Sequence, residues 1–333
     1  MKFFNTKILG TGCFLPDKIV TNDDLAKRIE TNHQWIVERT GIHQRRVADL
    51  SKGESPSGMA KIATMRALEA ANLTPNDIDL ILISATLSDQ AMPNTAAVLQ
   101  EKLGITNNCP TLDVNAACSG WIYLVPMADA MIKTGLYKHI LVVGSEMLSA
   151  FNNWDDRNTC ILFGDGCGVA ILGRASENED SQIFTSVLTC DSSKKDHLTL
   201  MAGGACKRIT HDVLEKNEQW MTMNGQEIFK AAVKTMASHA DKVVKDAGKT
   251  MEDVDWFIPH QANLRIIEAV GNRYNIPMEK VIINVDKYAN TSSASVPVAL
   301  DEAIRDGKIK RGDNVLLAAF GAGLTAGAVF LKY

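Results

Sequence analysis

The sequence lacks any long hydrophobic run. No stretch of about 18 uncharged apolar residues is present to span a bilayer. The first residues, MKFFNTKILGTGCFLP, also lack the continuous apolar stretch of a secretory signal. We therefore expect a cytoplasmic protein with no membrane partner.

A basic excess and paired cysteines are missing as well. The formal net charge is −4, and nucleic-acid binders usually carry a strong positive excess, so no nucleic-acid partner is expected. The seven cysteines are scattered, without a C-x-x-C pair or a Cys/His cluster at zinc spacing. The sequence therefore predicts neither a metal site nor a disulfide framework.

Short apolar runs alternate with helical patterns along the 333 residues. The runs predict strands at 79–85, 139–145, 167–173, 255–259, 280–285 and 314–320. The helical patterns lie at 57–72, 93–103, 226–247 and 262–274. Such alternation is typical of an α/β protein with largely parallel sheets that helices cover on both faces.

A weak internal repeat organises the chain. The helix, turn and strand of ATMRALEAANLTPNDIDLILISA recur in KTMASHADKVVKDAGKTMEDVDWFIPHQA. Aligning Gly135 with Gly307 gives an offset of 172, which places Cys118 opposite Asn290. We therefore expect two duplicated halves, 1–175 and 176–333, the first carrying Cys118 and the second carrying Asn290 and His260.

The segment 118–135 is apolar on nearly every face as far as Ile132, which is typical of a buried helix. One such helix from each half would pack between two sheets. The sequence thus predicts a layered α-β-α-β-α sandwich with Cys118 and Asn290 at its centre.

Cys118 is the candidate nucleophile. At a helix start, unpaired backbone N–H groups favour an anion and lower the pKa of a thiol. Small neighbours in NAACSG leave room for a substrate. The alternative is a buried structural thiol, the usual fate of a free cytosolic cysteine.

Two further polar residues lie at expected element ends. His260 follows the strand 255–259, at the end where α/β proteins build their sites, although a lone histidine is more often without a catalytic role. Asn290 lies at the mirrored helix start, where an asparagine also serves as an N-cap. A Cys, a His and an Asn fit covalent catalysis, and the spacing alone also describes a cysteine hydrolase.

Glycines cluster after the last strand, in AFGAGLTAG at 319–327. Glycines let the backbone approach a ligand and point N–H groups at an oxyanion, and a tight turn between strands is the alternative. The short glycine motifs at 10–12 and 163–168 complete neither the dinucleotide nor the P-loop pattern, so we interpret them as turns.

Taken together, the motifs resemble those of the β-ketoacyl-[acyl-carrier-protein] synthase III family, the initiating condensing enzymes of bacterial fatty acid synthesis. The resemblance covers essentially the whole chain. It rests, in chain order, on WIVERTGI, DVNAACSGW, FGDGCGVAIL, MNGQEIFK, IPHQANLRI, NTSSASVP and the terminal glycine-rich loop. It implies the thiolase-like five-layered sandwich and a homodimer.

The resemblance also implies an acyltransferase that needs no cofactor, with acyl-CoA and malonyl-[acyl-carrier-protein] (malonyl-ACP) as substrates. Cys118 matches the acyl-accepting nucleophile, and His260 and Asn290 match the pair that serves decarboxylation. The backbone N–H groups of Cys118 and Ala322 match the oxyanion hole. The implied reaction is a decarboxylative Claisen condensation that releases CoA and CO₂.

Other matching positions imply contacts with the two substrates. Those expected to bind CoA are Trp35, Arg39, Arg157 and Asn263. Those expected to meet the acidic carrier protein are Lys230, Arg265 and Arg273, for each of which a solvated surface role is the alternative.

Several positions depart from the family pattern. Ala322 stands at the middle glycine of the glycine-rich loop, Leu324 and Ala326 are smaller than the usual aromatics, and Ala289 replaces a glycine. Trp121 replaces a common Phe, and Pro126 interrupts the buried helix, where we expect a kink. We expect these changes to line or abut the acyl pocket.

The departures keep other functions open. The first is a related condensing enzyme of secondary metabolism or of long-chain acyl transfer, with a different primer. The second is a Cys-dependent thioester hydrolase. An HMG-CoA synthase is disfavoured because Leu87 stands where its acidic residue would fall, and a non-catalytic subunit is disfavoured because Cys118, His260 and Asn290 are all present.

Overall fold

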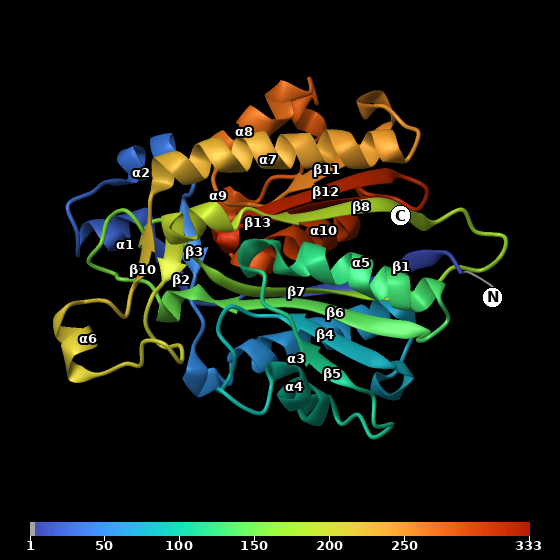
Figure 1. Ribbon diagram of the computed structural model, residues 1–333, viewed down its shortest axis with the longest axis horizontal. Helices are drawn as coiled ribbons and strands as arrows, with labels where there is room; N and C mark the ends of the chain where they lie inside the picture. The colour runs from blue at the N-terminus through green and yellow to red at the C-terminus, as the bar shows by residue number, and fades with distance from the viewer. Residues whose placement is uncertain (1–3) are drawn as a thin grey trace.

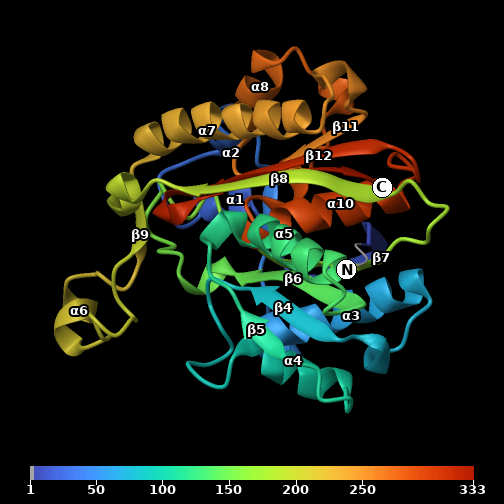
Figure 2. The ribbon, with the colours of Figure 1, turned by 45° about the vertical axis from the view of Figure 1, so that its right-hand side comes forward.

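Two main β-sheets alternate with three helical layers, and two small two-stranded sheets, β2-β3 and β9-β10, lie beside them (Figure 1). The computed structural model describes residues 4–333. Helices α7 and α8 form one outer layer, α5 and α10 lie between the sheets, and α3 and α4 cover the opposite outer face (Figures 1 and 2). The α-β-α-β-α sandwich predicted from the sequence is confirmed.

The strands are β1 (Thr6–Phe14), β2 (Ile19–Thr21), β3 (Gln44–Arg46), β4 (Leu80–Ser84), β5 (Thr111–Asp113), β6 (His139–Met147), β7 (Asp165–Arg174), β8 (Gln182–Cys190), β9 (Leu198–Leu200), β10 (Met221–Met223), β11 (Trp256–Pro259), β12 (Asn314–Gly321) and β13 (Thr325–Lys332). The α-helices are α1 (Asn22–Ala26), α2 (His33–Thr40), α3 (Pro56–Ala71), α4 (Thr95–Leu103), α5 (Gly120–Lys133), α6 (His211–Glu215), α7 (Gly225–Asp246), α8 (Leu264–Arg273), α9 (Val285–Tyr288) and α10 (Ser295–Arg305). Three short 3-10 turns matter for the site: η3 (Ala117–Ser119), η8 (Ser292–Ala294) and η9 (Ala322–Leu324).

The two main sheets repeat one topology. The first has the order β1-β7-β6-β4-β5, and the second runs β8-β13-β12-β11 in the same sense. In each, the first two pairings are antiparallel and the next is parallel. A single parallel bridge between Phe257 and Val281 stands in the second sheet where β5 stands in the first.

Two expectations about strands are wrong. The sheets are mixed rather than largely parallel, because β13 folds back on β12 after one 3-10 turn and β7 folds back on β6. The run 280–285 forms no strand, because a 3-10 turn occupies Met278–Lys280 and α9 begins at Val285. Only Val281 between them reaches the sheet edge.

Local sequence sets the helix ends. The side chain of Ser55 accepts a hydrogen bond from the amide of Gly58 and so caps α3, which starts with Pro56 in its first turn. Asn94 caps α4 in the same way, and Gly104 ends it in the left-handed conformation. These caps fix the outer helical layer against the first sheet.

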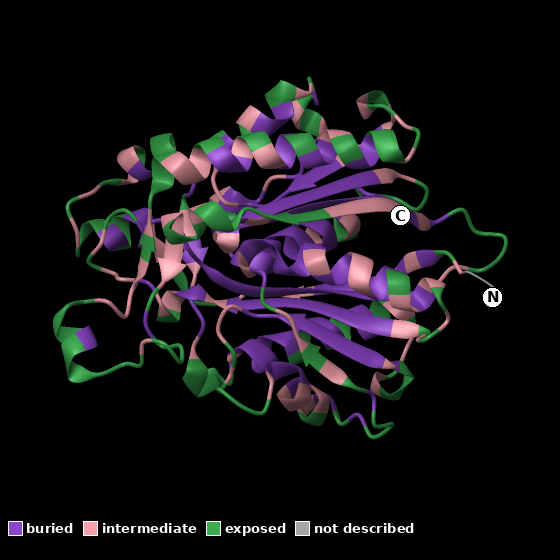
Figure 3. Ribbon diagram, viewed as in Figure 1, coloured by how far each residue is buried: buried purple, intermediate pink, exposed green. Residues whose placement is uncertain are grey.

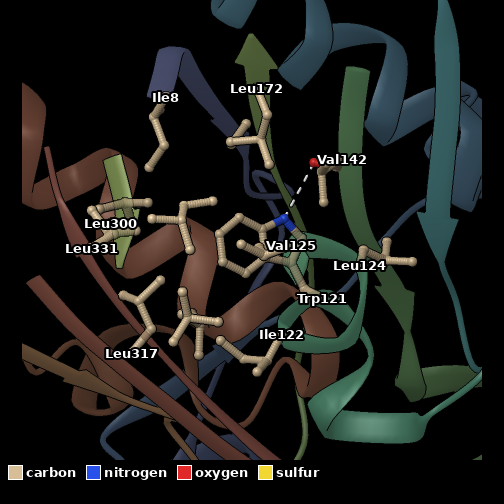
Figure 4. Packing of buried hydrophobic residues seen from close by; sticks show 14 of the residues in the cluster. Ile8, Trp121, Ile122, Leu124, Val125, Val142, Leu172, Leu300, Leu317 and Leu331 are labelled. Atoms are coloured by element: carbon tan, nitrogen blue, oxygen red, sulfur yellow. Dashed lines mark hydrogen bonds between the residues drawn. The ribbon is translucent and has the colours of Figure 1, made fainter. Parts of the chain in front are cut away.

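The core consists of three apolar layers, visible as buried strands and helices in Figure 3. The central layer lies between the sheets around α5 and α10, and Trp121 is among its largest members. Its indole Nε1 donates to the carbonyl of Val142 at 3.2 Å, and its ring packs near Val125 and Leu300 (Figure 4). Burial of a large aromatic side chain contributes several kcal/mol to stability, so Trp121 helps hold the two halves together.

Trp121 therefore lies in the core and does not line either cavity beside Cys118, contrary to expectation. Helix α5 continues through Pro126 from Gly120 to Lys133. Of the residues that depart from the family pattern, Ala322 lines a cavity next to Cys118, whereas Leu324 and Ala326 belong to the core on the outer face of the second sheet.

The repeat has a different register at the two ends of the central helices. α5 and α10 end at Lys133 and Arg305, as the offset of 172 requires, but they begin at Gly120 and Ser295. The left-handed residues before them, Ala117 with φ of 47° and Ser292 with φ of 50°, mark the same turn. Cys118 is thus equivalent to Ser293 rather than to Asn290, because α5 has 14 residues and α10 has 11.

Candidate active site

Cys118 lies between two cavities, each of about 390 Å³. The side chain is buried in η3, directly before α5. His260, Asn290 and Gly321 line the first cavity together with Cys118. Ser292 and Ala322 line the second cavity. The structure thus brings together the three residues that the sequence singled out, although the repeat register that suggested the pairing is wrong.

The thiol of Cys118 is protonated at neutral pH. Burial raises its pKa to about 11, and the nearby carboxylate of Glu146 adds to the rise. The hydroxyl of Ser292 and the backbone amide of Cys118 lower the pKa, but they do not offset burial. The expectation that the helix start lowers the pKa of Cys118 is therefore wrong, because loss of solvation outweighs the local donors.

His260 stands directly after β11 and is buried. Its backbone amide donates to the carbonyl of Ala318 on β12 at 2.7 Å, so the neighbouring strand fixes its position. The ring Nδ1 lies 2.6 Å from Oγ of Ser295, the first residue of α10. Burial lowers the pKa of His260 to about 3, so the ring is neutral at physiological pH.

Asn290 lies in a tight segment between α9 and η8. Its backbone amide donates to the carbonyl of Leu162, and its carbonyl accepts from the amide of Gly164. The segment directly before β7 therefore holds the backbone of Asn290 in place. Its Oδ1 accepts from the amide of Ser292 at 2.8 Å, a local turn rather than a cap of α10. With Oδ1 engaged, the amide nitrogen is the polar group that Asn290 offers to a ligand.

The glycine-rich loop approaches Cys118 closely. A Cβ atom on Gly321 would lie 2.7 Å from the amide nitrogen of Cys118 and 3.1 Å from its Cβ, so only glycine fits there without a shift. Ala322 follows in η9 and lines the second cavity. The hydroxyl oxygen of Thr325 lies 2.8 Å from the carbonyl oxygen of Ala116 and 2.9 Å from that of Ala322, so its one proton is shared between the residue before η3 and the loop.

An aromatic and cationic cluster stands at the mouth of the first cavity. The guanidinium carbons of Arg39 and Arg157 lie 4.1 and 4.6 Å from the ring centre of Trp35. Trp35 and Arg39 line the cavity itself, whereas Arg157 lies beside it and donates to the carbonyl of Glu30. The cluster presents a flat indole ring and two positively charged guanidinium groups at this end of the cavity.

The remaining predicted contacts lie on α7 and α8. Asn263 caps α8, donates to the carbonyl of Arg39 and lines the first cavity with Arg265. Lys230 is exposed on α7 and pairs with Glu227 at 2.9 Å. Arg273 is the last residue of α8, about 12 Å from Arg265 at helical rise, and it does not line the cavity.

The sequence analysis missed Glu146 and the serines of η8. Glu146 is fully buried near the end of β6, and it interacts electrostatically with Cys118. A usable signal was present, because Glu146 is the one acidic residue in the apolar strand HILVVGSEM. Among residues 4–333, no group of three or more His, Cys, Asp or Glu side chains is arranged to hold a metal ion.

Two family profiles match the chain. Residues 226–333 match 3-oxoacyl-[acyl-carrier-protein (ACP)] synthase III C terminal, and residues 112–192 match 3-oxoacyl-[acyl-carrier-protein (ACP)] synthase III. A curated relative from Caldanaerobacter subterraneus subsp. tengcongensis, β-ketoacyl-[acyl-carrier-protein] synthase III, is 47% identical over 326 residues, which are 98% of this chain and 97% of the relative.

This chain belongs to the β-ketoacyl-[acyl-carrier-protein] synthase III family. Membership identifies a condensing enzyme of the acyltransferase class.

Solved structures of this synthase III family have the same fold. The crystal structure of 3-oxoacyl-[acyl-carrier-protein] synthase III from Aquifex aeolicus VF5 superposes with a TM-score of 0.90 at 42% identity, covering 98% of this chain and 100% of the other. The priming β-ketosynthase from the R1128 polyketide biosynthetic pathway superposes with a TM-score of 0.89 at 30% identity, covering 99% and 97%. In the described part of this synthase III chain, no helix is long and apolar enough to cross a membrane.

Proposed function

We propose that the protein condenses an acyl-CoA primer with malonyl-ACP, releasing CoA and CO₂, and so initiates fatty acid synthesis. The observation that carries this proposal is the position of Cys118 between two cavities, one of which is shared with His260 and Asn290. The relatives of this chain named β-ketoacyl-[acyl-carrier-protein] synthase III support it.

Acyl transfer comes first. The sulfur of Cys118 attacks the thioester carbon of acyl-CoA, the bond to the CoA sulfur breaks, and an acyl-enzyme remains. The backbone N–H groups of Cys118 and Ala322 hold the oxyanion during the attack, which the tie between the glycine-rich loop and η3 supports. The second cavity, lined by Leu148, Leu200 and Met221, takes the acyl chain.

Decarboxylation and condensation follow. His260 and Asn290 donate to the thioester oxygen of the malonyl group and stabilise the enolate as CO₂ leaves. A neutral His260 suits this role. When Nδ1 accepts a hydrogen bond from Ser295, the ring proton is on Nε2, and the Nε2–H group donates a hydrogen bond to the thioester oxygen. The carbanion then attacks the acyl carbon, and Cys118 leaves as the thiolate.

The cavity mouth binds the carriers of the two acyl groups. Trp35, Arg39 and Arg157 stack on and pair with the CoA nucleotide, for which planar guanidinium groups are suited, and Asn263 meets the pantetheine arm. The positively charged side chains at and beside the mouth that meet the acidic carrier protein are Lys230, Arg265 and Arg273. Acyl-CoA and malonyl-ACP act as substrates, and the reaction needs no cofactor.

We also propose a cytoplasmic homodimer built from chains with two halves, 1–175 and 176–333. The strands of the first sheet all precede Ala175, and those of the second follow it, which supports the boundary. Strand β5 is the edge strand of the first sheet: it pairs with β4 on one side, and no strand of residues 4–333 pairs with its other side. Its Leu112 is exposed, and the nearby α5 carries the half-buried Met127 and Met131. An edge strand beside apolar side chains favours pairing with a second copy.

Priming of a specialised pathway is the second candidate. The likeness to a priming β-ketosynthase of a polyketide pathway favours it, because the same site chemistry serves a different primer and acceptor. A Cys-dependent thioester hydrolase would use the same nucleophile but release a free acid.

The test is incubation of the protein with a panel of acyl-CoAs, followed by intact mass measurement and addition of malonyl-ACP. We expect one acyl group on Cys118, then β-ketoacyl-ACP and CO₂. Cys118→Ala should neither gain the acyl group nor form product. If no acyl-CoA modifies the wild type, if the variant still condenses, or if free acid is the product, the proposed function is refuted.

A further inference from the structure

Glu146 lies at the centre of a buried hydrogen-bond cluster that the proposed chemistry does not use. Its Oε2 accepts from the amide of Thr86 at 2.9 Å. Its Oε1 accepts from the hydroxyls of Ser293 at 2.6 Å, Ser292 at 3.1 Å and Thr86 at 3.2 Å. The carboxylate thus joins β6, η8 and the segment after β4, and η8 in turn packs against η3.

Ser292 connects Glu146 to the neighbourhood of the nucleophile. Its hydroxyl donates to Oε1 of Glu146 at 3.1 Å and lowers the pKa of the Cys118 thiol, and its turn, η8, packs against η3. Ser292 and Cys118 also line the same cavity. The backbone of Ser292 is held in place by Oδ1 of Asn290, so the hydroxyl has a fixed position.

Few titratable groups surround Glu146. The thiols of Cys118 in η3 and Cys167 on β7 interact electrostatically with it, and the carboxylate of Asp165 is next along β7 to Gly166, the strand partner of Glu146. Asp165 bonds instead to the amide of Ala48 and to Ser149. The segment after β4 and η8 face Glu146 with hydroxyl and amide groups. Burial among these groups raises the pKa of Glu146 to about 7.

His260 is a poor acceptor for the Cys118 proton, because burial lowers its pKa to about 3. A general base works best when its pKa lies near the operating pH. Among the groups that surround Cys118, Glu146 meets that condition, and Ser292 connects the two.

We propose that Glu146 is a positioning residue for acyl transfer, which acts through Ser292 to accept the proton of Cys118 as the sulfur attacks the acyl-CoA. This inference rests on the proposed function and adds a proton pathway to it. The thiol proton moves to Oγ of Ser292, whose own proton moves to Oε1 of Glu146. The new bond joins Sγ to the acyl carbon, the bond from that carbon to the CoA sulfur breaks, and the proton returns from Glu146 to the departing CoA sulfur. The total charge of the cluster is conserved until CoA leaves, which suits a buried site.

The experiment separates the two half-reactions in the full-length protein. Single-turnover acylation by acyl-CoA is followed by mass from pH 5.5 to 9, and CO₂ release from malonyl-ACP is measured on enzyme acylated beforehand. The variants are Glu146→Gln, Ser292→Ala and the double variant. Asp165→Asn is the matched control, since it also replaces a buried, hydrogen-bonded carboxylate by an amide.

We expect Glu146→Gln and Ser292→Ala each to slow acylation roughly 100-fold, the low end for loss of a general base. The double variant should be no slower than either single variant, because both changes break one pathway. The fall in wild-type acylation below about pH 7, where Glu146 becomes protonated, should disappear in Glu146→Gln. In Glu146→Gln and Ser292→Ala, the rate of CO₂ release should stay at the wild-type level. In Asp165→Asn, the rate of acylation should also stay at the wild-type level.

Unchanged acylation rates and pH profiles in Glu146→Gln and Ser292→Ala would overturn the inference while leaving the proposed function intact. An equal loss in both half-reactions, or the same loss in Asp165→Asn, would also overturn it, because that pattern indicates a structural role. If Glu146→Gln does not fold, Ser292→Ala decides the question, since it keeps the carboxylate. A wild type that no acyl-CoA acylates would refute the proposed function and this inference with it.

Discussion

Replacing Gly321 by alanine tests how tightly the glycine-rich loop is packed on the nucleophile. The added Cβ would stand 2.7 Å from the amide nitrogen of Cys118, whereas ordinary contact begins at 3.4 Å, so the loop or η3 must move by about 0.7 Å. Both neighbouring groups are held, the loop by Thr325 and η3 by the start of α5. The strain cannot be relieved by turning a side chain.

A displacement of about 1 Å at a reacting centre can slow a reaction about 100-fold, so we expect Gly321→Ala to slow acylation of Cys118 on the order of 10- to 100-fold. Overpacking of a buried site costs about 1–3 kcal/mol, so the free energy of unfolding should fall by a similar amount. Acylation is measured by intact mass in a single turnover, and stability by urea denaturation.

Gly204→Ala is the matched control. No atom lies within 4 Å of a Cβ built on Gly204, and this glycine does not need a positive φ. Its acylation rate and stability should equal those of the wild type. A Gly321→Ala enzyme that acylates at the wild-type rate with unchanged stability would show that the loop does not abut Cys118 as described.

Two further predictions concern stability. Trp121→Ala should lower the free energy of unfolding by about 3–5 kcal/mol, as expected for removal of a buried aromatic side chain, and Trp121→Phe should lower it by clearly less. Urea denaturation measures both. Equal stability of Trp121→Ala and the wild type would contradict the packing of Trp121 in the central layer. His260 should make the protein less stable in acid: its pKa is about 3 when folded and about 6.5 when unfolded, so below pH 6.5 only the unfolded chain takes up the proton. Between pH 7 and pH 5 the wild type should therefore lose about 2 kcal/mol relative to His260→Gln, and parallel pH dependences would disprove the neutral, buried ring.

Much of the fold follows from local sequence. Apolar runs marked β4, β6, β7, β11 and β12, and helical periodicity marked α3, α4, α7 and α8 to within a few residues. The nearly all-apolar segment after Cys118 identified the central helix, because a helix without a broad polar face has to be covered on every side. The order of the sheets was not accessible in this way, since pairing direction depends on contacts between strands far apart in the chain.

For the candidate site, local motifs were enough to single out Cys118, His260 and Asn290, which the structure places around one cavity. Tertiary structure alone decided the register of the two central helices and the chemical state of the site. The pKa of Cys118 depends on burial and on Glu146, and the hydroxyl that lowers this pKa and donates to Glu146 belongs to Ser292, in the other half of the chain. Solvation and hydrogen bonding depend on which distant segments meet, and a local motif does not contain that information.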